Sequence, residues 1–116
     1  MVTWLDPQAR VERLRQAALR LMARRPDVRR AVLFGSLARG QGTPASDADL
    51  LLEVEAPDPS GLRALTSELL LAMRPLPCAI DLVLRTPTQV KRVSGEPDPL
   101  LDEIEATGIV LAEVAG

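Results

Sequence analysis

Histidine is absent from the sequence, and with it the imidazole that most often serves as a general base and metal ligand near neutral pH. A Ser-His-Asp triad and any zinc site built on histidine are therefore excluded. Cys78 is the only cysteine, so the chain can form no internal disulfide, and we expect a cytoplasmic protein. Catalysis by this chain must depend on carboxylates, hydroxyl groups and cationic side chains.

Aromatic residues are scarce and cations are not in excess. Trp4 and Phe34 are the only aromatic residues, which disfavours binding of single-stranded nucleic acid by base stacking. The 14 Lys and Arg residues are outnumbered by 16 Asp and Glu residues, so we expect no stand-alone DNA binding. No signal peptide is visible, and no apolar stretch approaches the roughly 20 residues that span a bilayer, so we expect no membrane partner.

The 116 residues, 47% of them hydrophobic, predict one domain over residues 1–116 with a substantial core. Apolar residues alternate between helical and strand spacing, which is typical of a layered α/β domain. Asp6-Pro7, Thr86-Pro87 and Asp98-Pro99 are predicted helix caps followed by first-turn prolines. We expect helices over 7–25, 62–73 and 99–104, and the last of these is stopped by Gly108. One further helical turn is expected over 36–39, with Ser36 as its cap. The expected strands cover residues 28–34, 47–55, 78–85 and 109–114.

Three acidic residues fall on or beside predicted strands. Asp47 and Asp49 are two positions apart, so both project from the same face, while Ala48, Leu50, Leu52 and Val54 take the other. Asp81 interrupts the apolar run 79–84, where an unneutralised charge is anomalous. If the strand of Asp81 lies beside that of Asp49, three carboxylates form one cluster. Hard oxygen ligands favour Mg²⁺ or Mn²⁺, and such a cluster can hold two ions for phosphoryl transfer.

Gly35-Ser36 comes directly after the first predicted strand. Gly35 lets the backbone approach a phosphate closely because it has no side chain. Ser36 can donate its hydroxyl and its backbone N–H, and the turn that it begins points free N–H groups at an anion. Arg39, one turn on, can add a charge-assisted contact. The segment therefore predicts a phosphate-binding loop immediately before the carboxylate pair.

Gly35-Ser36, ten residues and then Asp47-Ala48-Asp49 resemble the signature of the DNA polymerase beta-like nucleotidyltransferases. GSLARG followed by SDADLLLEV is most similar to the minimal nucleotidyltransferase (MNT) domains, and the likeness covers nearly the whole chain. The resemblance implies an α/β nucleotidyltransferase fold, a small mixed β-sheet flanked by helices. It also implies that Asp47 and Asp49 bind both metals and that Asp81 binds the catalytic metal and accepts a proton. By the same likeness, Gly35, Ser36 and Arg39 hold the triphosphate.

The resemblance further implies a function and a partner. The expected reaction is Mg²⁺-dependent transfer of a nucleoside monophosphate, with ATP the commonest donor, to an acceptor hydroxyl. Many MNT domains are encoded beside an all-helical HEPN protein, and in several such pairs the MNT protein is an antitoxin that neutralises a HEPN toxin by adenylylating it. The alternatives are a non-catalytic antitoxin that caps such a partner and a nucleotidyltransferase of small molecules. Larger relatives carry an acceptor-selecting domain that this chain lacks, so the acceptor is expected to be another molecule or to be bound by a homo-oligomer.

Several residues also have a purely structural interpretation. Asp81 could pair with Arg85, and Arg39 could anchor its loop through a salt bridge. The arginines of the first helix are more typical of a solvated face than of a nucleic-acid patch. Cys78 is expected to be a small core residue without redox chemistry.

Overall fold

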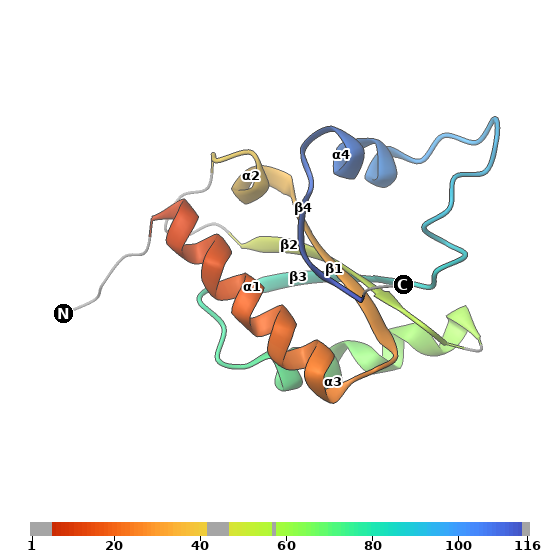
Figure 1. Cartoon of the computed structure of the whole chain (residues 1–116). Coiled ribbons are helices and arrows are strands. Elements are labelled where there is room, and N and C mark those ends of the chain that lie inside the picture. Colours follow the sequence, from red (N-terminus) through yellow and green to blue (C-terminus); the bar gives the residue numbers. More distant parts are fainter. Residues whose placement is uncertain (1–5, 42–46, 57, 115–116) are drawn as a thin grey trace.

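A four-stranded mixed sheet forms the centre of the computed structural model, which describes residues 6–41, 47–56 and 58–114 (Figure 1). The strands lie in the order β3-β2-β1-β4. The central strand β1 pairs antiparallel with both β2 and β4, whereas β2 pairs parallel with β3. The strands are β1 (Val28–Phe34), β2 (Ala48–Val54), β3 (Ile80–Arg85) and β4 (Ile109–Glu113). The predicted α/β class with a mixed sheet is confirmed, and β3 and β4 form the edges.

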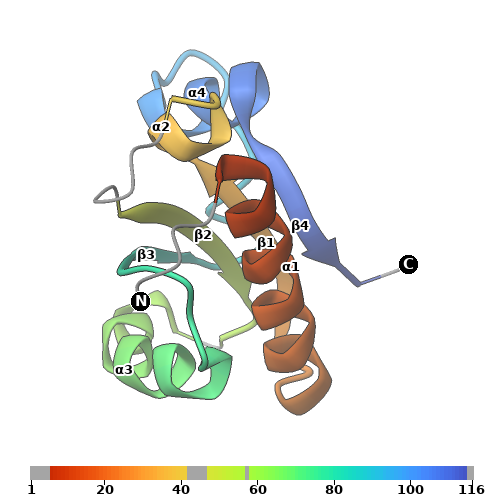
Figure 2. The same ribbon diagram turned by 90° about the vertical axis from the view of Figure 1, so that its left-hand side faces the viewer.

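The long helices cover one face of this sheet. The helices are α1 (Pro7–Arg24), α2 (Gly35–Ala38), α3 (Leu62–Met73, after a 3₁₀ turn over Pro59–Gly61) and α4 (Pro99–Thr107). Figure 2 shows α2 and α4 together at the top and α3 at the bottom, while α1 runs from beside α2 down to the lower end of the view. None of the described helices combines the length and apolar character needed to cross a bilayer.

The alternation of side chains along the strands creates two different faces. Side chains of β1 and β2 at every second position join α1 and α3 in one buried cluster, which includes Leu14, Leu33, Leu50, Leu52 and Leu69. Val32 and Leu51 are equally buried but lie outside that cluster, as does Leu101 of α4. The second face of the sheet is therefore covered in part by α4. Asp49 alternates with Leu50, so it belongs to this second face.

Hydrogen bonds confirm the helix caps predicted at Asp6 and Asp98, whereas the prediction at Thr86 is wrong because only a turn follows and no helix. The Asp6 carboxylate accepts from the Ala9 N–H at 2.7 Å, and the Asp98 carboxylate accepts from the Leu101 N–H at 3.2 Å. Thr86 and Gln89 form a reciprocal pair, in which each side chain accepts from the other residue's N–H, and this pair closes a single turn.

Some predicted boundaries differ from the structure. Helix α2 begins at Gly35 rather than after Ser36, and its N-cap is Phe34, which forms no side-chain capping bond. Helix α4 continues three residues past 104 to Thr107. Gly108 ends that helix in an extended conformation, and a Cβ there would lie 2.6 Å from the Ile104 carbonyl oxygen. A lack of space, and not a left-handed backbone, thus requires glycine at this position.

Candidate functional site

Asp49 and Asp81 are direct partners in the parallel ladder of β2 and β3. Because paired residues of a parallel ladder project to the same side, both carboxylates face away from the cluster that contains Leu50. Leu82, the register partner of Leu50, packs against that cluster, which fixes the orientation of β3. Asp47 is exposed, one residue before β2 begins. The two strands thus bring the acids, distant in sequence, to one edge of the second face.

Asp81 is exposed, which corrects the expectation of a buried charge. The reason is topological, because β3 is an edge strand with a neighbour on one side only. The structural partner considered for Asp81 is engaged elsewhere, since Arg85 forms an ion pair with Asp98 at 2.8 Å. An exposed carboxylate in this place is accessible to an incoming molecule.

Gly35 lies directly beneath the Asp49 carboxylate. Its φ angle is +77°, a left-handed conformation that side chains rarely adopt. A Cβ on Gly35 would overlap Asp49 Oδ2 and lie 3.1 Å from Asp49 Cγ. Glycine is therefore required here by its backbone conformation and by the acid above it, a reason that the sequence did not reveal.

Burial raises the pKa of Asp49, and the charges of Asp81, Glu103 and Asp47 raise it further. The Arg39 guanidinium acts in the opposite direction on this pKa. Negative charge therefore exceeds positive charge around Asp49, an environment that favours binding of a cation.

The acids converge without forming a closed metal site. Within residues 6–41, 47–56 and 58–114, no three Asp, Glu, Cys or His side chains are grouped closely enough to hold a metal ion. Mutual repulsion opposes tighter clustering of ionised carboxylates when no cation lies between them. The chemistry of the residues still fits Mg²⁺, because the oxygen ligands of Asp49 and Asp81 are adjacent in register.

The predicted phosphate-binding loop is the four-residue helix α2, which connects β1 to the segment before β2. Ser36 is half-buried in its first turn, and its carbonyl accepts from the Gln41 N–H at 2.9 Å. Arg39 ends the helix and forms an ion pair with Glu103 of α4, with 2.8 Å between Nη1 and Oε1. Arg39 thus forms the salt bridge that its structural interpretation predicted.

Two charged residues near the site were not singled out from the sequence. Arg10 is 3% exposed, so the assignment of the α1 arginines to a solvated face is wrong for this one. Burial raises the pKa of the Cys78 thiol, while the charge of Arg10 lowers this pKa and the charge of Asp47 raises it. The spacing of Arg10 from Leu14, Ala17 and Leu21 on the buried side of α1 could have revealed it. No local pattern marks Glu103, which approaches Arg39 only through the packing of α4.

Comparisons with known proteins identify the family and the fold of the chain. The family model of the nucleotidyltransferase domain matches residues 12–106, which include all three acids and Gly35-Ser36. A proposed nucleotidyltransferase from Sulfolobus solfataricus has a similar fold, with a TM-score of 0.65 and 14% identity over 93% of this chain and 84% of that one. No curated protein sequence matches the chain.

A second solved structure is similar to the chain. It is a toxin–antitoxin structure with AMP-PNP, with a TM-score of 0.55 and 20% identity over 86% of this chain and 73% of the matched one. At these identities both structures show the fold alone. The resemblance to nucleotidyltransferases that the sequence motifs indicated is confirmed by the family model, which covers more than half of the chain.

Proposed function

The chain belongs to the nucleotidyltransferase domain family, and we propose that it transfers a nucleoside monophosphate, AMP from ATP, to an acceptor hydroxyl. The observation that supports this proposal most directly is the register pair of Asp49 and Asp81, with the Asp49 carboxylate lying over Gly35. A carboxylate pair beside a glycine-serine loop is suited to hold a triphosphate and an attacking hydroxyl next to each other.

Each proposed site residue has a distinct role. Gly35, Ser36 and Arg39 bind the triphosphate through backbone N–H groups, a hydroxyl and a guanidinium. Asp81 accepts the proton of the acceptor hydroxyl while the new O–P bond forms at the α-phosphorus and pyrophosphate leaves. Its exposure on β3 suits this role, because the acceptor must approach from solvent. Asp47, Asp49 and Asp81 would hold Mg²⁺, expected as two ions, which supplies charge neutralisation when bound.

A partner protein is the proposed acceptor. The fold of the chain resembles that in the toxin–antitoxin structure with AMP-PNP, an ATP analogue, which supports ATP as donor and a toxin as partner. The HEPN class of this partner is proposed from the resemblance of the sequence motif alone. The chain contains no tyrosine, so modification of a tyrosine requires a residue on another protein.

The test is incubation of the protein with Mg²⁺, α-labelled ATP and the product of the adjacent gene as candidate partner. Label is expected on the partner with the wild-type protein and is expected to be lost with Asp49→Asn and Asp81→Asn. Glu53→Gln is the matched control, because Glu53 lies on the same face of β2 about 13 Å farther along the strand. Retained transfer by both Asp variants would refute the proposed roles.

A non-catalytic antitoxin is the second candidate function. The observation that favours it is the engagement by Glu103 of Arg39, a residue that the catalytic proposal needs for binding the triphosphate. On this hypothesis Asp49→Asn neutralises the toxin as well as the wild-type protein does. Toxin neutralisation and label transfer by the same variant therefore separate the two functions.

A further inference from the structure

The ion pair between Arg39 and Glu103 joins the proposed phosphate-binding loop to helix α4. Arg39 Nη1 lies 2.8 Å from Glu103 Oε1, and Arg39 Nε lies 3.4 Å from the side-chain oxygen of Gln41. The short contact with Glu103 is therefore the dominant interaction of this guanidinium. The two side chains are 38% and 36% exposed, so both remain accessible to a ligand from solvent.

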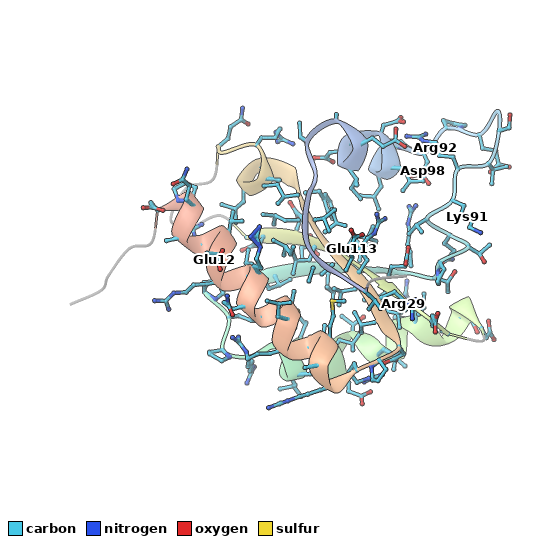
Figure 3. The ribbon with its side chains drawn as sticks, in the orientation of Figure 1. Glu12, Arg29, Lys91, Arg92, Asp98 and Glu113 are labelled. Carbon is cyan, nitrogen blue, oxygen red and sulfur yellow. The ribbon has the colours of Figure 1, made fainter. Side chains whose placement is uncertain are left out.

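Helix α4 is held in place by contacts that do not involve Glu103. Asp98 caps its first turn and pairs with Arg85, and Leu101 is 5% exposed. Arg92 forms ion pairs with Asp102 at 2.6 Å and with Glu105 at 2.7 Å. Figure 3 shows Arg92 and Asp98 beside this helix. Because these contacts position α4 independently, Glu103 is free to serve a purpose other than fastening the helix.

Glu103 also acts on the metal-binding part of the proposed site. Its negative charge reaches the Asp49 carboxylate, as does the opposing positive charge of Arg39. A triphosphate bound beside Gly35 would enter the same region and compete for the same guanidinium. An arginine that forms a short contact with a carboxylate must give up this contact, at least in part, when its guanidinium binds a phosphate instead.

We propose that Glu103 is an internal competitor of the nucleotide, which holds Arg39 when the site is empty and releases it to the triphosphate on binding. This inference rests on the proposed function and adds a positioning residue from outside the sequence motif. Glu103 lowers nucleotide affinity in two ways, by occupying Arg39 and by repelling the polyanion. In return it keeps the guanidinium near the loop when no phosphate is present.

The test is calorimetric titration of the purified protein with Mg²⁺·AMP-PNP. We expect Glu103→Gln to tighten binding roughly two- to five-fold, the range that a partly exposed ion pair accounts for. Glu105→Gln is the matched control, because it removes the same charge from the same helix and leaves Arg39 paired. This control variant is expected to change the affinity by less than about 1.5-fold. Circular dichroism of both variants checks that α4 is intact.

The Arg39→Ala background separates release of the guanidinium from simple loss of a negative charge. There the gain from Glu103→Gln is expected to fall below about 1.5-fold, since no guanidinium remains to be released. An equal gain in both backgrounds would overturn the competitor role, as would unchanged or weaker binding by Glu103→Gln itself. If no variant binds Mg²⁺·AMP-PNP, the proposed nucleotide function fails, whereas binding that ignores Glu103 overturns this inference alone.

Discussion

Gly35→Ala is the sharpest test of the geometry around Asp49. The substitution adds one methyl group at a position with φ +77°, where it would overlap Asp49 Oδ2. Two independent costs follow, one from the backbone conformation and one from displacement of the carboxylate. The second cost exists only if Asp49 lies over Gly35 as the structure shows.

The two costs can be estimated separately. A non-glycine residue in the left-handed region costs about 1–2 kcal/mol. Rotating the Asp49 side chain away from its preferred rotamer and refilling the space adds about 1–2 kcal/mol. We therefore expect Gly35→Ala to lower the free energy of unfolding by about 2–4 kcal/mol, a large part of the stability of a small domain. The same rotation is expected to weaken Mg²⁺·AMP-PNP binding.

Urea unfolding of a matched pair isolates the second cost. Gly95 has a φ angle of +83°, and a Cβ added there would meet no atom within 4 Å, so Gly95→Ala carries only the backbone cost of about 1–2 kcal/mol. Alanine also restricts the unfolded chain, but it does so equally in both variants. In an Asp49→Ala background, the extra loss of stability caused by Gly35→Ala is expected to disappear. Only the Cβ of residue 49 then remains near the added methyl group, at 3.4 Å from the Cβ of residue 35.

Equal destabilisation by Gly35→Ala and Gly95→Ala would contradict the placement of Asp49. The same conclusion would follow if the extra loss at position 35 persisted after Asp49 was truncated. Either result would remove the contact that connects the glycine-serine loop to the carboxylate pair, and the proposed site would lose its geometric basis.

Three further predictions concern charge, capping and the core. Because the pKa of Asp49 is raised, the folded protein binds a proton on this carboxylate more tightly than the unfolded chain does. The metal-free wild-type protein therefore loses stability as the pH rises from about 4, near the pKa of the unfolded chain, through the raised pKa of the folded protein. Asp49→Asn avoids this loss, and its melting temperature should exceed that of the wild type at pH 7 but not below about pH 3. Asp6→Ala removes the α1 cap and should cost about 1 kcal/mol in urea unfolding, while Asp6→Asn should cost much less. Leu52→Ala should cost about 2–5 kcal/mol because this side chain is fully buried, whereas Leu71→Ala, at 59% exposure, should cost less than about 0.5 kcal/mol.

Most of the fold could be predicted from local patterns. The strand β1 matches its predicted bounds, and β2 and β3 are shorter by one or two residues at their ends. These strands were recognisable because apolar runs end near glycine or proline. Asp-Pro pairs marked the first turns of α1 and α4, and the spacing of apolar residues marked α3. Gly108 was correctly predicted as a stop signal, although its conformation differs from the usual left-handed cap.

The site could be predicted only as a set of residues. The exposure of Asp81 depends on the position of β3 at the sheet edge, and strand order is not encoded in local spacing. The choice between a phosphate contact and a salt bridge for Arg39 depended on Glu103, which is 64 residues away in sequence. The burial of Arg10 was hidden by the expectation that arginines lie on solvated faces, although its helical spacing was that of the core.

Glu103, which no local pattern marked, changes the charge balance of a site already recognised by its motif. It adds negative charge near Asp49, whereas Arg39 adds positive charge there. On the proposed function, the affinity of the site for a cation or a polyanion therefore depends partly on α4. A motif records which side chains meet the substrate, because those are fixed by local spacing. The motif does not show how strongly neighbouring charges weaken or strengthen substrate binding. Coulomb interactions act between elements that are distant in sequence and pack together only in the folded chain. Related chains with identical motifs can therefore differ in nucleotide affinity through changes confined to the closing helix.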